Sequence, residues 1–405
     1  MITGKTIICL STIDWHYAKQ RHQIFMEHFL KSGNQVIFVE HLGFAPQQFR
    51  DIANISRRVV RALFGRQNLK SRRPPIPNLH IMTPLVLPPR NDMYNALNKY
   101  IFLPLLAKKI LRVCAHQPIV WTYLATSTAV NLIRRLAPRM VIYDCVYDAL
   151  RHPEAPFDIV QTEQALLHLA DAVVTDGKYF FDEKKKQHSR VYQVPPGVDF
   201  EHFFRPSVSP AAAAAFDRIK KPRVCFFGCM GNEQKKSNEQ SRIDMDLLVT
   251  MARQRPAWSI VLIGPLVNME LPECLRAMPN IHWLGYVPYQ ELPAYLAQCD
   301  ALMLPYLVNQ CTEVIMPAKL FECLATGKPV IATAMAELAF YGSVITIAHS
   351  AAEFLAHLDR VLTFDEEAHQ QQRISFARDN TWEGRFKKLS EILEQAEYEK
   401  PRNKG

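Results

Sequence analysis

The sequence predicts an α/β protein built from two Rossmann-like, doubly wound domains that face each other across a cleft. Three observations support this fold class. Short apolar runs alternate with helical patterns along most of the chain, which is typical of parallel sheets made from βαβ units. The alternation stops once, near residues 200–220, and then resumes. The length of 405 residues suits about two to three domains.

The first half contains six apolar runs that predict strands, and residues 17–32 predict a helix that Gly33 terminates. The expected strands are Ile7–Leu10, Val36–Val39, Ile119–Tyr123, Met140–Tyr143, Ala172–Thr175 and Val191–Val194. Residues 1–200 are therefore expected to form the N-terminal domain. The prolines and the alanine run between residues 201 and 220 predict a linker or a loosely packed helix.

The second half repeats the pattern from residue 221 to residue 380, which we expect to form the C-terminal domain. Its expected strands are Val224–Phe227, Ser259–Ile263, Ile281–Leu284, Ala301–Leu304, Pro329–Ala332 and Val344–Ile347. Helices are expected at Met245–Arg253 and Leu292–Gln298. Residues 381–405 predict a last helix that packs back on the first domain.

Composition limits the function classes. Apolar residues make up 48% of the chain, which argues against a disordered protein, and the length argues against a small disulfide-stapled one. The net charge of +9 is modest, and it suits phosphate groups or an anionic membrane better than nucleic acid. Nine cysteines, mostly inside apolar runs, favour reduced thiols. Without an apolar run of membrane-spanning length or a signal-peptide pattern, a cytoplasmic location is expected, with peripheral membrane attachment as an option.

The most informative segment follows the strand expected at Ala301–Leu304. Pro317 suits the first turn of a short helix, and Gly327 suits its end. Lys319 and Glu322 are three residues apart and so project from one helix face. The cation can neutralise a diphosphate, and the carboxylate can accept hydrogen bonds from two ribose hydroxyls. On spacing alone, an exposed Lys–Glu pair without a ligand remains the alternative.

Two other motifs carry less information. Gly228 and Gly231 follow a strand directly, so they predict either a backbone that approaches a phosphate or an ordinary turn. Asp244 and Asp246 invite a metal-site interpretation, which we reject because residues two apart on a helix do not share a face. No metal site and no cofactor are expected.

The run Pro317-x-Lys319-x-x-Glu322, continuing to Gly327-Lys328-Pro329-Val330, resembles the donor-binding signature of GT-B glycosyltransferases of the group 1, GT4-like branch. Residues 194–199, 259–265 and 280–296 resemble the branch's interdomain hinge, its strand ending in Gly-Pro and its nucleobase loop. Residues 11–21 resemble its N-terminal opening. The similarity covers nearly the whole chain and is strongest in residues 223–335.

The resemblance implies a glycosyltransferase that moves a sugar from a nucleotide sugar to a hydroxyl of a polysaccharide or lipid-linked acceptor. It implies a metal-independent and, as is usual for the branch, retaining reaction. The donor-binding residues are then expected to be Gly228, Arg242, Gly264, Tyr286, Val287, Pro317, Lys319 and Glu322. In this interpretation Arg242 contacts the diphosphate alongside Lys319, and the two cations replace a metal in stabilising the departing nucleotide.

The first domain offers Asp14 and Arg21 as acceptor-side candidates, and Asp144 and Asp148 as catalytic candidates together with Lys319. If the enzyme inverts, one of the latter two aspartates is the general base. The alternative is that both aspartates only cap their loop.

The sequence also departs from the family pattern. Many relatives carry a glutamate eight positions before the one matching Glu322, but Val314 stands there, with Glu313 one position away. Tyr147 replaces an acidic residue. Two alternatives therefore stay open: a nucleotide-sugar hydrolase or epimerase on the same fold, and a GT-B-like binding subunit without catalysis.

The segment Arg50–Arg73 combines eight basic residues with interleaved apolar ones and carries one acidic residue, Asp51. It predicts either contact with an anionic membrane surface or a solvated basic face. No nucleic-acid-binding module surrounds it. The expected partners are therefore a nucleotide sugar, a glycan or lipid-linked acceptor and, through this segment, a membrane, but not a nucleic acid.

Overall fold

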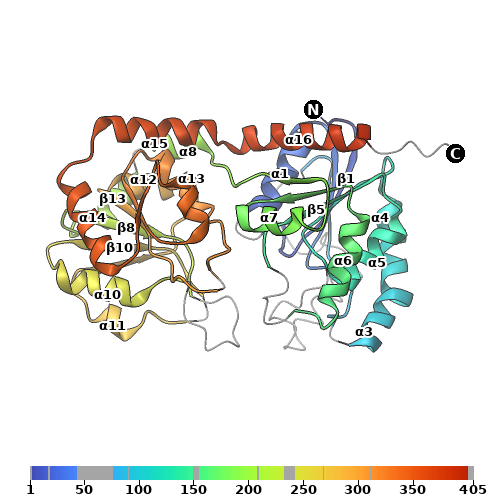
Figure 1. Cartoon of the computed structure of the whole chain (residues 1–405), viewed down its shortest axis with the longest axis horizontal. Coiled ribbons are helices and arrows are strands. Elements are labelled where there is room, and N and C mark those ends of the chain that lie inside the picture. The colour runs from blue at the N-terminus through green and yellow to red at the C-terminus, as the bar shows by residue number, and fades with distance from the viewer. Residues whose placement is uncertain are drawn as a thin grey trace. The chain divides into compact units, whose positions relative to one another are not determined.

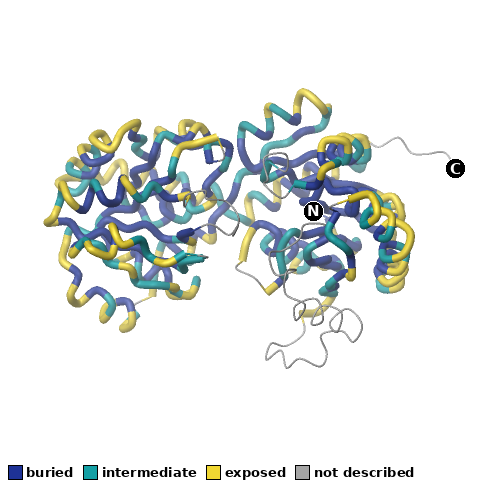
Figure 2. The backbone as a smooth tube through the Cα atoms, turned by 90° about the horizontal axis from the view of Figure 1, so that it is seen from below, coloured by how far each residue is buried: buried dark blue, intermediate teal, exposed yellow. Residues whose placement is uncertain are grey.

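The computed structural model describes residues 2–16, 19–42, 76–89, 91–148, 155–207, 209–231, 242–267, 269–310 and 312–399. The chain forms two compact units (Figure 1). Unit 1 comprises residues 1–195 and 385–405, and unit 2 comprises residues 196–384. The strands of both units are mostly buried, whereas exposed residues concentrate on the helices and loops around them (Figure 2).

In the described residues, unit 1 is built on a seven-stranded parallel sheet in the order β3-β2-β1-β4-β5-β6-β7. Its strands are β1 (Thr6–Leu10), β2 (Gln35–Val39), β3 (Leu79–Met82), β4 (Ile119–Thr122), β5 (Met140–Cys145), β6 (Ala172–Thr175) and β7 (Val191–Gln193). β1 lies beside β4 with Ile7 opposite Ile119. The strand order reverses at this pair, so β1 and β4 mark the switch point of a doubly wound sheet.

The helices of unit 1 are α1 (Arg21–Lys31), α3 (Asp92–Leu97), the π turn η3 (Asn98–Phe102), α4 (Leu103–Leu111), α5 (Ser127–Leu136), α6 (Ile159–Leu169), α7 (Lys178–Lys185) and α16 (Trp382–Glu399). Helices α4, α5 and α6 contact one another in a row. Right-handed crossovers place α1 on the opposite face of the sheet. There α16 covers α1, because Phe386 stacks 5.1 Å from the His28 ring and packs edge-on, at 4.9 Å, against Phe29.

Unit 2 has a six-stranded parallel sheet in the order β12-β10-β8-β13-β14-β15. Its strands are β8 (Arg223–Phe227), β10 (Ser259–Ile263), β12 (Ile281–Gly285), β13 (Ala301–Leu304), β14 (Val330–Thr333) and β15 (Thr346–Ala348). A small second sheet pairs β9 (Met230–Gly231) with β11 (Leu266–Val267). The switch point of the large sheet lies between β8 and β13.

Around this sheet lie α8 (Phe200–Phe204), α9 (Pro210–Phe216), α10 (Met245–Gln254), α11 (Glu273–Arg276), α12 (Leu292–Ala297), α13 (Lys319–Ala325), the 3₁₀ helix η4 (Ala336–Tyr341), α14 (Ala351–Thr363) and α15 (Glu367–Asp379). Of the two alternatives predicted for residues 201–220, a linker or a loosely packed helix, the structure has helices. Phe203 and Phe216 are buried in the core of unit 2, because the alanine-rich stretch forms a short helix rather than a free connection.

The chain passes between the two units twice, and the two passages run side by side near Val198 and Thr381. The N–H of Val198 donates to the Asn380 carbonyl over 3.1 Å, and the N–H of Trp382 donates to the Val198 carbonyl over 3.2 Å. Gly197 permits this approach, since a Cβ there would lie 2.6 Å from the Trp382 nitrogen. The second passage leads directly into α16.

The predicted strands match the observed ones to within two residues at each end. The predicted first helix starts too early, because α1 begins only at Arg21, where the N–H of Gln20 bonds to the Gln23 side chain over 3.0 Å. Strand β3 was not predicted. None of the helices in the described ranges combines the length and the hydrophobicity that a membrane span requires.

Candidate active site

The carboxyl edge of the unit 2 sheet is lined by glycines. Parallel doubly wound sheets bind ligands at this edge, beside the switch point. Gly228 follows β8, Gly264 follows β10, and Gly285 ends β12. Hydrogen bonds join these loops: the N–H of Gly228 donates to the Ile263 carbonyl over 2.8 Å, and the N–H of Gly264 donates to the Gly285 carbonyl over 2.7 Å. The three strand ends therefore form one connected backbone surface.

Two of these glycines have a backbone conformation that is strained for any residue with a side chain. Gly264 has φ +140°, and a Cβ there would lie 1.9 Å from the Gly228 carbonyl oxygen. Gly228 has φ +138°, and its Cβ would lie 2.1 Å from Cε of Lys319. The Lys319 side chain thus runs directly across the Gly228 backbone. The structure brings together three residues that the sequence predicted in separate motifs.

Lys319 is the first residue of α13 and is half-buried. Buried Pro317 precedes it, and its carbonyl accepts the N–H of Leu320 over 3.1 Å. Tyr306 first, and then Glu322, raise the pKa of the Lys319 ammonium, while burial opposes them. Lys319 therefore stays positively charged at neutral pH.

Glu322 lies one helical turn after Lys319 and is also half-buried. Burial raises the pKa of its carboxyl group to about 7, and the charge of Lys319 counteracts part of that rise. Tyr289 is close by: burial first, and then the charges of Glu322 and Asp199, raise the pKa of its phenol. The Tyr289 ring stacks on His202 with 4.7 Å between ring centres.

Arg242 is exposed next to the loop that follows β13. Its carbonyl accepts the N–H of Leu307 over 2.9 Å, and Ile243 pairs with Tyr306. These bonds fix the backbone at Arg242 to the loop that carries Tyr306, the residue that raises the pKa of Lys319. Asp244 caps α10 by accepting the N–H of Leu247 over 2.8 Å.

The loop after β12 exposes aromatic surface. Tyr286 is 71% exposed, and Val287 is half-buried against the core of unit 2. Trp283 is 43% exposed, and its indole N–H donates to the Gly264 carbonyl over 2.9 Å. Sequence reasoning missed Trp283 and Tyr289. The sequence indicates them only in that both are aromatic residues within residues 280–296, the run that resembles the nucleobase loop.

In unit 1, the catalytic candidate Asp144 lies inside the fold. Asp144 has no exposed surface, and its Oδ2 accepts Nε of Arg21 at 2.9 Å and the indole N–H of Trp121 at 3.2 Å. Arg21 also donates to the Val194 carbonyl over 2.8 Å. Burial raises the pKa of Asp144, and Arg21 opposes this rise. The pair ties α1 to the ends of β5 and β7, so Arg21 and Asp144 both act inside the fold.

The other predicted residues of unit 1 lie nearer the surface. The Asp14 side chain is 41% exposed, with Oδ1 3.1 Å from Nε2 of His41. Asp148 and Tyr147 are half-buried in the loop after β5, and the charge of Asp148 acts on Lys184.

The departures from the family pattern in unit 2 have a packing explanation. Val314 is 4% exposed and so occupies an apolar position, where a carboxylate would be strongly destabilising. Glu313, beside it, is half-buried. The segment Arg50–Arg73 lies outside the described residues.

Part of the chain matches a known protein family. Residues 221–363 match the family model of glycosyl transferases group 1. Over 243 residues the chain is 25% identical to TuaH of Bacillus subtilis (strain 168), which is provisionally named a teichuronic acid biosynthesis glycosyltransferase. That match covers 57% of this chain and 58% of TuaH, so the chain spans under two thirds of this curated relative.

Solved structures match nearly the whole chain. Anabaena HepE, in complex with UDP and glucose, has a TM-score of 0.65 at 12% identity, covering 96% of this chain and 99% of HepE. Sucrose-phosphate synthase from Thermosynechococcus elongatus has a TM-score of 0.64 at 14% identity, covering 96% and 98%. The solved structures confirm the predicted GT-B fold. The predicted resemblance is confirmed as well, because residues 221–363, which lie within unit 2, are similar to the group 1 glycosyltransferases.

Proposed function

We propose that this protein transfers a sugar from a nucleotide-sugar donor to a hydroxyl group of a polysaccharide or lipid-linked acceptor. HepE was solved with UDP and glucose and also with UDP-glucose, and TuaH is named for the biosynthesis of a polysaccharide, teichuronic acid. UDP-sugars are therefore the first donors to test.

The observation that carries the proposal is the position of Lys319 across Gly228. The ammonium group lies at the carboxyl edge of the sheet, beside the switch point, against a backbone that has no Cβ. A diphosphate at this edge can approach the glycine backbone closely and accept charge-assisted hydrogen bonds from the cation. The same cation stabilises the negative charge that develops on the departing nucleotide.

Arg242 supplies the second cation of this proposal. It is exposed, and its backbone is fixed to the loop carrying Tyr306. With Lys319 and Arg242 in place, the protein provides two positive charges for the diphosphate, and we propose that the transfer is metal-independent. Retention of configuration, as is usual for the branch that the sequence resembles, belongs to the same proposal.

The remaining donor contacts follow from Glu322 and the loop after β12. An ionised Glu322 carboxylate accepts hydrogen bonds from the ribose hydroxyls, one helical turn away from the diphosphate site. The exposed rings of Trp283 and Tyr286 offer stacking surface for a nucleobase, beside the backbone of Val287. On the acceptor side, Asp14 and Asp148 remain the candidate contacts in unit 1, since Arg21 and Asp144 are engaged with each other.

The test begins with a panel of nucleotide sugars in a thermal-shift assay, because a ligand that binds the folded state raises its melting temperature. With the best donor, Lys319→Ala should lose about 1.5–3 kcal/mol of binding or transition-state free energy, or roughly 10- to 150-fold. The exposed Lys220, in the same unit, provides a matched control as Lys220→Ala. Equal donor affinity and turnover in wild type and a folded Lys319→Ala variant would remove the main support for the proposal.

A second candidate is a binding subunit without catalysis, which the buried apolar side chain at Val314 favours. Donor binding without turnover, in the presence of an acceptor mixture, would support this candidate. Conversion of the donor without any acceptor would instead indicate a hydrolase or an epimerase.

Membrane attachment through Arg50–Arg73 stays a prediction of the sequence. Binding of the protein to anionic vesicles through this segment should weaken as salt is added. Salt-insensitive binding would argue for a different kind of contact.

A further inference from the structure

Large apolar side chains are exposed along one helical run of unit 1. Helices α3, η3 and α4 follow one another without a break from Asp92 to Leu111. Of the fifteen large apolar side chains that are exposed among the described residues, five lie on this run: Met93, Tyr100, Ile101, Leu105 and Leu111. Leu105 is 65% exposed and Tyr100 is 68% exposed. Such a concentration on one element marks an interaction surface.

The run also has an ordinary inward side. Leu103, Leu106 and Ile110 are buried against unit 1, so the core does not need Ile101 and Leu105, which are exposed. A surface helix normally carries polar residues on its solvent side. Helix α4 instead presents apolar residues on both sides, and this calls for a second apolar environment.

Cations surround the exposed apolar residues. They are Lys99, Lys108, Lys109 and Arg112 from the run, and Arg134 and Arg135 from α5. Arg135 donates to the Lys99 carbonyl over 2.6 Å, which ties the two helices together at this surface. Asp92 is the single acidic residue within residues 91–113 and 127–136.

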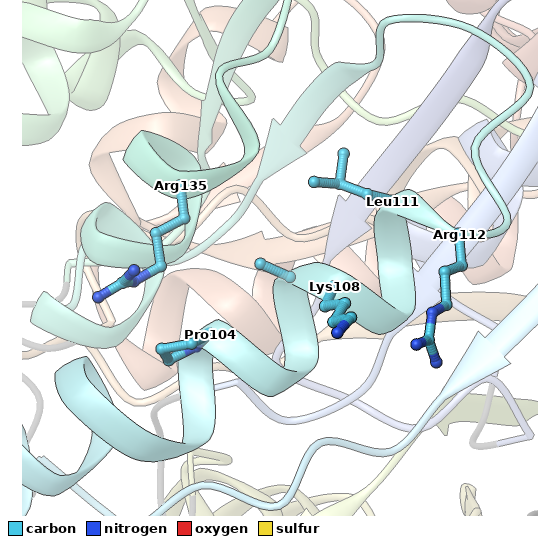
Figure 3. A pocket seen from close by; sticks show the side chains of 6 residues that line it. Pro104, Lys108, Leu111, Arg112 and Arg135 are labelled. Carbon is cyan, nitrogen blue, oxygen red and sulfur yellow. The ribbon is translucent and has the colours of Figure 1, made fainter.

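Apolar and basic residues meet in one open hollow of about 580 Å³, lined by Pro104, Ala107, Lys108, Leu111, Arg112 and Arg135. Figure 3 shows Lys108 on α4, Arg112 directly after the end of α4, and Arg135 on the neighbouring α5. Basic side chains mixed with exposed Leu, Ile and Tyr on one helix face match the chemistry of the lipid headgroup region, where apolar side chains insert and cations contact anionic headgroups.

We propose that the exposed side of α3, η3 and α4, together with Arg134 and Arg135, docks on an anionic lipid bilayer. A second copy of this chain fits the surface less well, because two such faces would bring like charges together. Helix α3 follows β3, so the run starts near the carboxyl edge of the unit 1 sheet. Docking there would hold this edge close to a lipid-linked acceptor; that consequence, but not the docking itself, rests on the proposed function.

The experiment is co-sedimentation of the full-length protein with two kinds of vesicle, phosphatidylcholine alone and phosphatidylcholine with roughly one third phosphatidylglycerol. Wild type should bind the second kind and not the first. Ile101→Gln/Leu105→Gln and, separately, Lys108→Glu/Arg112→Glu should each weaken this binding by at least about tenfold. The matched control is Phe364→Gln/Lys220→Glu, which changes an exposed apolar residue and an exposed cation of unit 2 and should bind like wild type.

Three results would overturn the proposal. The first is that wild type does not sediment with the anionic vesicles. The second is that the face variants bind normally while Arg57→Gln/Arg58→Gln/Arg61→Gln loses binding, which assigns the membrane contact to the basic segment. The third is that Ile101→Gln/Leu105→Gln dissociates a dimer seen by light scattering. A thermal unfolding curve of every variant, recorded by circular dichroism, reports folding, and UDP-glucose binding is measured separately. If wild type binds vesicles but no nucleotide sugar, the proposed function fails while the docking surface stands.

Discussion

The two units place charged residues at the same edge of the same kind of sheet, but they use them differently. In unit 1, Arg21 and Asp144 are buried and bonded to each other, to Trp121 and to the Val194 carbonyl. In unit 2, Lys319 and Glu322 are half-buried beside a glycine backbone that holds no side chain. A charged pair at a strand end therefore does not by itself mark a ligand site. The two cases differ in that the glycine backbone of unit 2 lets Lys319 lie directly against it.

The sharpest test of this comparison is the removal of Asp144. Asp144→Ala leaves the Arg21 guanidinium buried without its counter-charge, which should lower the free energy of unfolding by about 3–5 kcal/mol. Urea unfolding of the whole protein measures this change. The apolar double variant Arg21→Met/Asp144→Leu should recover most of the loss. If the double variant is stable and binds donor but does not transfer sugar, Asp144 has a direct role and the comparison fails.

In unit 2 the corresponding test is Gly264→Ala. Its Cβ would collide with the Gly228 carbonyl, and its φ of +140° is unfavourable for alanine, so we expect a loss of about 2–4 kcal/mol in stability and a loss of donor binding. Gly285→Ala is the matched control: Gly285 also has a positive φ, +72°, but open space where the Cβ would be. That variant should lose only about 1–2 kcal/mol. Equal losses would show that backbone conformation, not close approach, governs this edge.

Glu322 provides a pH test. Its pKa in the folded protein, about 7, lies above its ordinary value of 4.5, so the folded state keeps a proton that the unfolded chain releases first. The stability contribution of this group is therefore fully present below about pH 4.5 and is lost as the pH rises to about 7. Glu322→Gln should consequently be more stable than wild type at pH 8, by roughly 1–2 kcal/mol, and similar to it at pH 5.

Donor binding should follow the opposite course in wild type. Ionisation of Glu322 creates the acceptor for the ribose hydroxyls, so donor affinity should rise between pH 6 and pH 8, roughly the range in which a group of this pKa titrates. This rise should be absent in Glu322→Gln. Calorimetric titrations with UDP-glucose at several pH values measure both effects, and a parallel rise in the variant would assign the titration to another group.

The smallest effect is expected for Arg242→Ala. Because Arg242 is exposed, its contact with a diphosphate is screened, and the loss of donor affinity should be about 0.2–1 kcal/mol and should shrink with added salt. Lys319→Ala, measured in parallel, should show a larger and less salt-dependent loss. The opposite ranking would move the main phosphate contact from Lys319 to Arg242.

Much of the fold could be predicted because buried parallel strands are continuous apolar runs. β1 and β10, for example, are buried at every position. β3 escaped prediction because only Met82 of its four residues is buried, as suits a strand at the sheet edge. The sequence left a linker and a loosely packed helix open at residues 201–220, because alanine and proline predict little about packing. The burial of Phe203 and Phe216, which decides between them, depends on contacts with the rest of unit 2.

The site was predictable where its residues are close in sequence. Lys319 and Glu322 share a helix face by spacing alone. Arg21 and Asp144 are 123 residues apart in the sequence, and no local pattern shows that their side chains bind each other. Trp283 was missed for a similar reason, because its bond to the Gly264 carbonyl depends on the pairing of β12 with β10.

The two adjacent chain passages at Val198 and Thr381 have a consequence for dissecting the protein. Cutting the chain after residue 195 yields a fragment that lacks Phe386, which covers Phe29 and His28, so a simple N-terminal truncation should aggregate. Because the passages are hydrogen-bonded to each other, a short Gly/Ser bridge from residue 195 to residue 385 should reconnect unit 1 as an autonomous domain. Unit 2, residues 196–384, is then already a single uninterrupted stretch that can be produced by itself.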